Sequence, residues 1–202
     1  MSAIAVRALR TRIHPSSTAF FLCDIQEKFK PHIYQYHYVI STAKKMISAG
    51  KLLDIPLIVT EQNPKGLGPT DSQLDIEDAR IITPKTKFSM WTPEVQDTVH
   101  RLGTKSVVLF GIESHVCVLQ TALDLLDADL DVYVLRDGVS SMNAGEIPIA
   151  IEFLRTAGCK IVSSESVLFQ LLQDASHPQF KAISGLVKES KDTTKATFES
   201  ML

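Results

Sequence analysis

Three residues far apart in the sequence, Asp24, Lys85 and Cys117, are of the types that a thiol-dependent hydrolase needs. A carboxylate can accept the proton of a thiol, a lysine can hold the charge of the carboxylate, and the thiolate is the nucleophile. A free thiol has a pKa of about 8.5, so few thiols are ionised at neutral pH without such help. The predicted chemistry is attack by the thiolate on a carbonyl carbon, followed by hydrolysis.

Cys117 is placed in the first turn of a predicted helix. The apolar run Ser106–Phe110 predicts a buried strand, and apolar residues at helical spacing predict an amphipathic helix over 114–126. The first turn of a helix has unpaired N–H groups and the positive end of the helix dipole, which favour a thiolate. The same N–H groups can stabilise an oxyanion. Cys23, inside an apolar strand, is predicted to be inert, and Cys159 has no comparable setting.

The hydrophobic pattern predicts alternating strands and helices. Strands are predicted at residues 19–23, 56–60, 80–82, 106–110, 131–135 and 160–162. Helices are predicted at 37–53, from 92 onwards, at 114–126, 146–157, 165–174 and 178–188, with a long loop over 61–78. This alternation predicts the α/β class, as a three-layer α/β/α fold with a six-stranded parallel sheet (Rossmann-like).

The order of the strands decides whether the candidate residues meet. In a sheet of order 3-2-1-4-5-6, ligands bind beyond the carboxyl ends of the first and fourth strands. Asp24 directly follows the first predicted strand and Cys117 lies just after the fourth. If the chain adopts this order, the acid and the thiol share one crevice. Lys85, on the loop after the third strand, is the candidate cation, and Lys87 is the alternative.

Composition and charge narrow the function classes. The 202 residues predict one main domain, and the net charge of −2 indicates no nucleic-acid or anionic-membrane surface. Three cysteines do not make a disulfide framework, so a reducing, cytoplasmic setting is expected. The predicted organisation is an N-terminal arm (1–16), a hydrolase domain (17–188) and a loose C-terminal tail (189–202). The arm has three arginines and no acid, so mitochondrial import is the alternative location.

Four short motifs point to a known family. They are Asp24-Ile25-Gln26-Glu27-Lys28-Phe29, Thr60-Glu61-Gln62, Lys85-Thr86-Lys87-Phe88-Ser89 and Gly111-Ile112-Glu113-Ser114-His115-Val116-Cys117. Through them the chain resembles the isochorismatase-like cysteine hydrolases over residues 17–188. Within that family it most resembles the eukaryotic isochorismatase-domain-containing proteins, through the stretches Leu168–Leu172 and His177–Lys181.

The resemblance implies a triad of Asp24 as base, Lys85 as electrostatic partner and Cys117 as nucleophile. It also implies a cis peptide bond between Ile112 and Glu113, an oxyanion hole formed by the N–H groups of Glu113 and Cys117, and the strand order given above. The implied reaction is attack on a small amide or ureide, release of the amine, and hydrolysis of a thioester. Relatives commonly form dimers or tetramers, so a homodimer or higher homo-oligomer is expected.

No metal or other cofactor is expected. Nicotinamidases hold a metal through an Asp-x-His pair and a later histidine, whereas residues 61–66 here contain no histidine. Phe29, Gln62, Phe88 and Trp91 flank the motifs and are predicted to line a substrate pocket. Packing in the core is the alternative for the aromatic residues.

Two other functions stay open. A hydrolase of the isochorismate type cleaves a vinyl ether without a thiol nucleophile, and a binding or redox-sensing protein on the same fold would not turn over amides. His115 neighbours Cys117 in sequence, but residues two apart on a helix face different sides, which disfavours a Cys–His pair.

Overall fold

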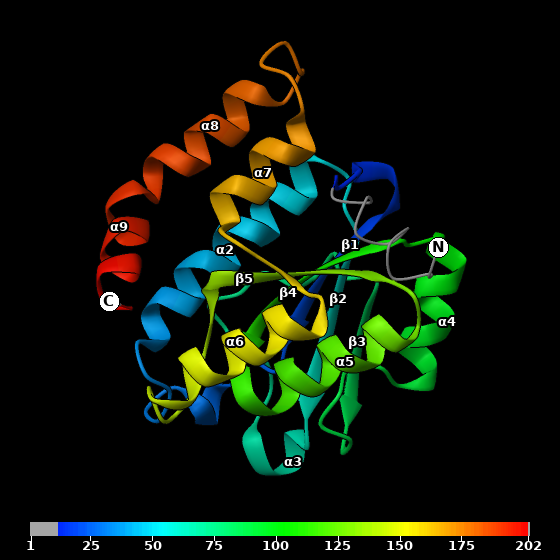
Figure 1. Ribbon diagram of the computed structural model, residues 1–202, viewed down its shortest axis with the longest axis vertical. Coiled ribbons are helices and arrows are strands. Elements are labelled where there is room, and N and C mark those ends of the chain that lie inside the picture. Colours follow the sequence, from blue (N-terminus) through cyan, green and yellow to red (C-terminus); the bar gives the residue numbers. More distant parts are fainter. Residues whose placement is uncertain (1–11, 202) are drawn as a thin grey trace.

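The computed structural model describes residues 12–201, which form a three-layer α/β/α fold (Figure 1). All strands pair in parallel in one six-stranded sheet of order β3-β2-β1-β4-β5-β6. This is the order that the sequence led us to expect. The strands are β1 (Thr18–Cys23), β2 (Leu57–Gln62), β3 (Ile81–Lys85), β4 (Ser106–Ile112), β5 (Asp131–Ser140) and β6 (Lys160–Val162).

Helices cover both faces of the sheet. One face carries α2 (Tyr36–Leu52), α7 (Ser164–Leu172), α8 (Phe180–Glu189) and α9 (Lys191–Glu199). The other carries α4 (Pro93–Leu102), α5 (Leu119–Asp127) and α6 (Glu146–Ala157). Short helical segments lie in the connections, namely η1 (Pro15–Ser17), η2 (Glu27–Phe29), α3 (Pro64–Leu67) and the π-helical η3 (Ser114–Val118).

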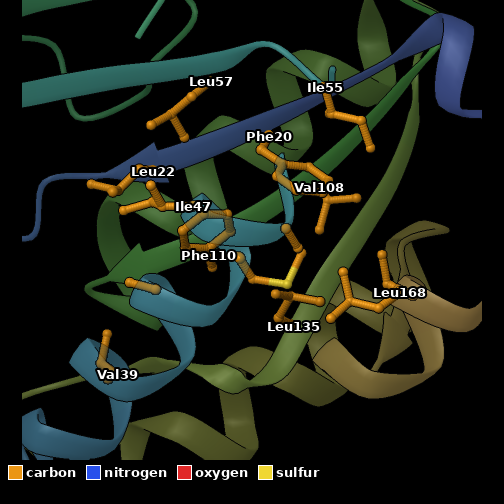
Figure 2. Close-up of a cluster of buried hydrophobic side chains, with 14 of the residues drawn as sticks. Phe20, Leu22, Val39, Ile47, Ile55, Leu57, Val108, Phe110, Leu135 and Leu168 are labelled. Atoms are coloured by element: carbon orange, nitrogen blue, oxygen red, sulfur yellow. The ribbon is translucent and has the colours of Figure 1, made fainter. Parts of the chain in front are cut away.

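The two layers of helices pack on two separate hydrophobic cores. Successive side chains of a strand point to opposite faces, so Phe20 of β1 joins the core under α2 while Phe21 and Cys23 join the core under α5. Figure 2 shows the first core, in which Phe20 and Phe110 lie between β1, β4 and α2. Burial of such a side chain stabilises the fold by about 2 kcal/mol. The central strands are thereby held side by side, with their carboxyl ends at one edge.

The strands β1 and β4 approach each other closely at Gly111. Its φ is +127°, and a Cβ atom there would lie 2.1 Å from the carbonyl oxygen of Cys23, its partner in the sheet. Only glycine tolerates both the dihedral angle and the contact. The segments that follow the two strands therefore start next to each other, and these segments contain Asp24 and Cys117.

Several elements extend beyond their predicted limits. The strands β2, β4 and β5 continue to Gln62, Ile112 and Ser140, because parallel neighbours pair with them beyond the apolar runs. The predicted loop over 61–78 contains the end of β2 and the short helix α3. The predicted helix over 114–126 is the π-helical η3 followed by α5.

The prediction of a loose C-terminal tail is wrong for most of its residues. Residues 189–202 were predicted to be loose, but Lys191–Glu199 forms α9. Lys45 Nζ of α2 donates to Thr194 Oγ1 at 3.1 Å, and Tyr34 Oη donates to the carbonyl oxygen of Ser200 at 3.2 Å. The spacing of apolar residues does not indicate such polar contacts, so the sequence did not predict this helix.

Most of the N-terminal arm, and with it the question of targeting, lies outside the described residues. Within residues 12–201, no helix combines the length and the apolar character needed to cross a membrane.

Candidate active site

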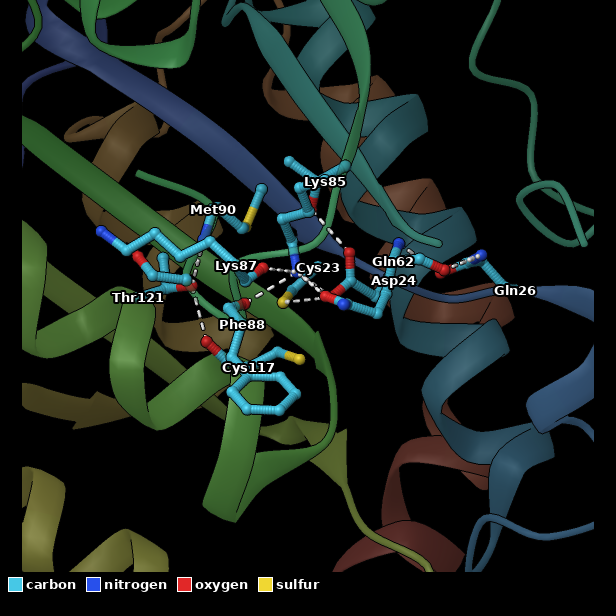
Figure 3. Close-up of polar contacts among 12 residues, drawn as sticks. Cys23, Asp24, Gln26, Gln62, Lys85, Lys87, Phe88, Met90, Cys117 and Thr121 are labelled. Atoms are coloured by element: carbon cyan, nitrogen blue, oxygen red, sulfur yellow. Dashed lines mark hydrogen bonds and ion pairs between the residues drawn. The ribbon is translucent and has the colours of Figure 1, made fainter. Parts of the chain in front are cut away.

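Asp24 and Lys85 form a buried ion pair at the carboxyl ends of β1 and β3 (Figure 3). Lys85 Nζ lies 2.6 Å from Asp24 Oδ2, and both side chains are 1% exposed. Asp24 directly follows β1 with a φ of +50°, and its Oδ1 accepts a 2.8 Å hydrogen bond from Thr60 Oγ1 of β2. Both oxygens of the carboxylate are therefore bound from neighbouring strands.

The ammonium group of Lys85 is held by further acceptors. It donates to Gln62 Oε1 and to the carbonyl oxygen of Phe88, each at 2.7 Å. Lys87, the alternative cation, instead pairs with Asp124 Oδ2 at 2.5 Å on the surface. The structure thus brings Lys85, and not Lys87, to Asp24.

Cys117 lies in η3, the π-helical turn that follows β4, and is 6% exposed. Its side chain is within hydrogen-bonding contact of Cys23, and Figure 3 draws both cysteines with Asp24 and Lys85. Thr121 Oγ1 donates to the carbonyl oxygen of Cys117 at 2.6 Å and accepts from the N–H of Met90 at 2.8 Å. This hydroxyl ties the segment after β3 to the turn that carries the thiol.

Cys23 contacts both Asp24 and Cys117, which its place inside an apolar strand did not predict. It is completely buried, and its Sγ lies 3.7 Å from Asp24 Oδ2. Burial raises the pKa of the Cys23 thiol, and its hydrogen-bonding contact with Cys117 and the negative charge of Asp24 raise it further. A raised pKa keeps the Cys23 thiol protonated and therefore unreactive, as the sequence predicted. Its side chain nevertheless contacts Cys117, so Cys23 is part of the surroundings of that thiol.

The backbone before Cys117 is fixed at Glu113. The peptide bond between Ile112 and Glu113 is cis. The carbonyl oxygen of Glu113 accepts from the N–H groups of Val116 and Val118, both at 3.1 Å, and Glu113 Oε2 accepts from the N–H of Met142 at 2.7 Å. These contacts orient the first turn of η3, where the predicted oxyanion donors lie.

Comparison with known proteins places this geometry in a family, since the isochorismatase domain matches residues 18–166. The chain belongs to the isochorismatase family. It is 42% identical over 179 residues to isochorismatase domain-containing protein 1 of Danio rerio, covering 88% of this chain and 63% of that protein. It is 43% identical over 185 residues to isochorismatase domain-containing protein 2A of Mus musculus, covering 92% and 89%. The chain thus spans less than two thirds of the length of the Danio rerio relative.

A solved structure of a family relative superposes closely. The MAR1 ribonuclease from Caenorhabditis elegans has a TM-score of 0.84 and 42% sequence identity, covering 88% of this chain and 93% of that one. Both sequence and fold therefore place the chain in the isochorismatase family.

In this isochorismatase-family protein, two of the four predicted substrate-binding residues, Gln62 and Phe88, contact Lys85. The carbonyl oxygen of Phe88 accepts from Lys85 Nζ, and the residue is 49% exposed. Gln62 is close, but its amide is already engaged, since Oε1 accepts from Lys85 and Nε2 donates to the carbonyl oxygen of Thr86 at 2.9 Å. Gln62 therefore orients the lysine.

The other two predicted pocket residues pack against the cores. Phe29 contacts the core under α2, and Trp91 contacts the core under α5. His115 also turns away from the thiol chemistry, because its Nδ1 lies 2.9 Å from Ser141 Oγ on the segment after β5.

Sequence analysis assigned no role to two polar residues that support the site. Thr60 binds Asp24, as described above, and Gln26 fixes the end of β2 by accepting from the N–H of Gln62 at 2.7 Å and donating to its carbonyl oxygen at 3.0 Å. Both belong to the motifs quoted for the family, so their presence was visible in the sequence and their contacts were not.

No metal-binding cluster of three or more His, Cys, Asp or Glu side chains occurs within residues 12–201. The cation that faces Asp24 is the ammonium group of Lys85.

Proposed function

We propose that this isochorismatase-family protein is a cysteine hydrolase that cleaves a small amide or ureide. The observation that carries the proposal is the buried Asp24–Lys85 ion pair beside Cys117. A buried ion pair is a weak source of stability, because removal of both charges from water costs about as much as their attraction returns. Such a pair next to a thiol is typical of a catalytic site.

The first half of the proposed reaction forms a thioester. Asp24 takes the proton of the Cys117 thiol, and the sulfur attacks the carbonyl carbon of the substrate. The electron pair of the carbonyl moves to oxygen, where the N–H groups of Glu113 and Cys117 stabilise it. When the carbonyl reforms, the C–N bond breaks and the leaving nitrogen takes the proton from Asp24.

The second half restores the enzyme. Asp24 takes a proton from a water molecule, and the resulting hydroxide attacks the thioester carbon. The C–S bond breaks and the acid leaves, and Asp24 returns the proton that it took from water to the sulfur of Cys117. Lys85 stays beside Asp24 throughout, so the charge of the carboxylate is offset in each ionised state.

A panel of small amides and ureides tests the proposal by release of amine or ammonia. The wild-type protein should turn over at least one compound, and Cys117→Ala should lower kcat/KM at least about a thousandfold, because the nucleophile is gone. Cys159→Ala is the matched control, since Cys159 is a buried cysteine in the core under α5 and outside the triad. Mass spectrometry of the wild-type protein with a slow substrate should detect the acyl adduct on Cys117.

Other outcomes distinguish the alternatives. Activity that survives in Cys117→Ala would indicate the isochorismate type of hydrolysis, and no turnover of any compound would indicate a binding or redox-sensing protein.

The C. elegans relative is described as a ribonuclease, so RNA belongs in the panel. The net charge of −2 disfavours RNA as a substrate of this chain, since phosphate binding depends on lysine and arginine. Cleavage of RNA without cleavage of amides would overturn the proposal.

We also propose that the chain assembles into a homodimer or a larger homo-oligomer. Ile149 and Phe153 lie one turn apart on α6 and are 65% and 53% exposed, and large exposed apolar side chains mark contact surfaces. Light scattering should give a mass above that of one chain, and Phe153→Glu should shift the mass toward the monomer. A wild-type monomer at micromolar concentration would contradict this.

A further inference from the structure

A cavity of about 180 Å³ lies at an open edge of the sheet, and none of the proposed catalytic residues lines it. Its walls come from the start of α2, the end of β5, the start of α6 and the end of α9. In Figure 1 these segments meet at the side of the molecule where α9 descends beside α2. Most of the lining is apolar and includes Val39, Val139, Ile147 and Pro148.

The cavity exists because β6 is shorter than β5. The strand β6 pairs with residues 133–135 only, so β5 has no neighbour on that side beyond Leu135. The end of α9 covers part of this open edge, and Tyr34 links the two by donating its Oη to the carbonyl oxygen of Ser200 and by accepting from Ser140 Oγ with its own carbonyl oxygen. The space between them is left unfilled by side chains.

Arg136 is the only cationic residue among those that line the cavity, and Asp137 is the only acidic one. Its side chain is partly buried, and its Nη1 is buried without a hydrogen-bond partner among the described residues. The neighbouring Asp137 does not supply one, because its carboxylate oxygens accept from the N–H and from the hydroxyl of Ser164. Burial lowers the pKa of the Arg136 guanidinium, as expected for a cation that has lost water.

We propose that this cavity binds a small monocarboxylate with an apolar body. The carboxylate pairs with the guanidinium of Arg136, whose planar N–H groups match the two oxygens of a carboxylate, and the hydrocarbon part contacts Val139 and Ile147. A cavity of about 150 Å³ holds a benzene ring, so an anion of the size of benzoate or hexanoate fits. The apolar lining disfavours a phosphate, which needs polar groups on all sides. This proposal does not depend on amide hydrolysis.

Calorimetric titration of the full chain with benzoate and hexanoate tests the proposal. The titrations are made on the wild-type protein and on Cys117→Ala, because a carboxylate could also occupy the catalytic site as a product. Both proteins should bind with the same affinity. The uncharged analogues benzyl alcohol and 1-hexanol should bind at least tenfold more weakly, because they cannot pair with the guanidinium.

Variants at Arg136 locate the binding site. Arg136→Gln should weaken carboxylate binding at least tenfold. Arg136→Lys should have an affinity between those of the wild-type protein and Arg136→Gln, because it keeps the charge and loses the paired N–H groups. Arg155→Gln is the matched control, since Arg155 is an exposed arginine on α6 and does not line the cavity. If Arg136→Gln does not fold, Ala144→Phe, at an exposed lining residue, should block the cavity and give the same loss.

Three results would overturn the proposal. They are equal affinity of the wild-type protein and Arg136→Gln, the absence of binding by either carboxylate at millimolar concentration, and binding that is lost when Cys117 is alkylated. The last result would assign the carboxylate to the catalytic site.

Discussion

Neither charge of the Asp24–Lys85 pair is solvated on its own, since both side chains are 1% exposed. Lys85→Met should therefore lower the free energy of unfolding by about 3–5 kcal/mol, because the carboxylate of Asp24 would stay buried without its cation. Urea unfolding at neutral pH measures this difference. Asp24→Asn in the same chain should recover most of the loss, because the uncompensated charge is then removed.

A lysine two residues away provides the control for this prediction. Lys87 pairs with Asp124, but its side chain is 53% exposed, so Lys87→Met should change the free energy of unfolding by less than about 1 kcal/mol. If the two lysine variants lost equal stability, the buried pair would not carry the energy assigned to it.

At this residue scale, sequence reasoning predicted the residue types that meet but not all of their contacts. Asp24 and Cys117 could be brought together because each directly follows an apolar run, and such runs fix where strands end. The engagement of Gln62 by Lys85 depends on the directions of side chains on neighbouring strands. The contact of Cys23 with Cys117 likewise follows from the register of β1 and β4, which spacing in the sequence does not reveal.

At the scale of elements, Gly111 controls how closely β1 and β4 approach. Gly111→Ala should lower the free energy of unfolding by at least about 3 kcal/mol, because the new Cβ would meet the backbone of Cys23 at 2.1 Å in a dihedral region that other residues avoid. Any folded protein should also lose hydrolytic activity, since Asp24 and Cys117 follow the displaced strands. Thermal and chemical denaturation measure the first effect.

Gly185 is the matched control, because it lies in α8. Apart from its chain neighbours and its own helix backbone, no heavy atom of residues 12–201 lies within 4 Å of a Cβ built on it. Gly185→Ala should stabilise the protein by about 0.5–1 kcal/mol, since alanine loses less conformational freedom than glycine in a helix. If both variants lost similar amounts of unfolding free energy, the close approach of β1 and β4 at Gly111 would not be the cause of the loss.

The elements that sequence reasoning predicted are those whose apolar residues are buried. The strand β6 and the helix α6 have their predicted limits, because their apolar patterns and Gly158 mark where they begin and end. The helix α9 was missed since its sequence is mostly polar and it is held in part by the Lys45–Thr194 hydrogen bond. The π-helical η3 was missed because it spans only five residues, too few to alter the helical spacing of the apolar residues that follow.

On the scale of the whole molecule, three buried acids retain their protons longer in the folded chain than in the unfolded one. Burial raises the pKa of the Cys23 thiol and that of Tyr36, whose hydroxyl also donates to Asp71 at 3.0 Å, and it raises the pKa of Tyr133 to about 12. The folded state therefore binds more protons than the unfolded state above pH 9, roughly where free thiols and tyrosines begin to ionise. Burial lowers the pKa of Lys45 and that of Arg136, and both shifts act in the opposite direction.

Between pH 7 and about pH 8.5 these three groups should leave the free energy of unfolding unchanged. At higher pH it should fall, by up to about 1.4 kcal/mol per pH unit for each raised group. Urea unfolding between pH 7 and pH 11, a range in which free cysteine and tyrosine titrate at about 8.5 and 10, measures the slope. Tyr133→Phe should reduce the slope above about pH 10, and Cys23→Ala should reduce it from about pH 9, because each removes one retained proton. Cys23 and Tyr133 are completely or nearly completely buried, so both should ionise less easily than in water. An unchanged slope in both variants would contradict this, because it would mean that their pKa values are the same in the folded and unfolded chains.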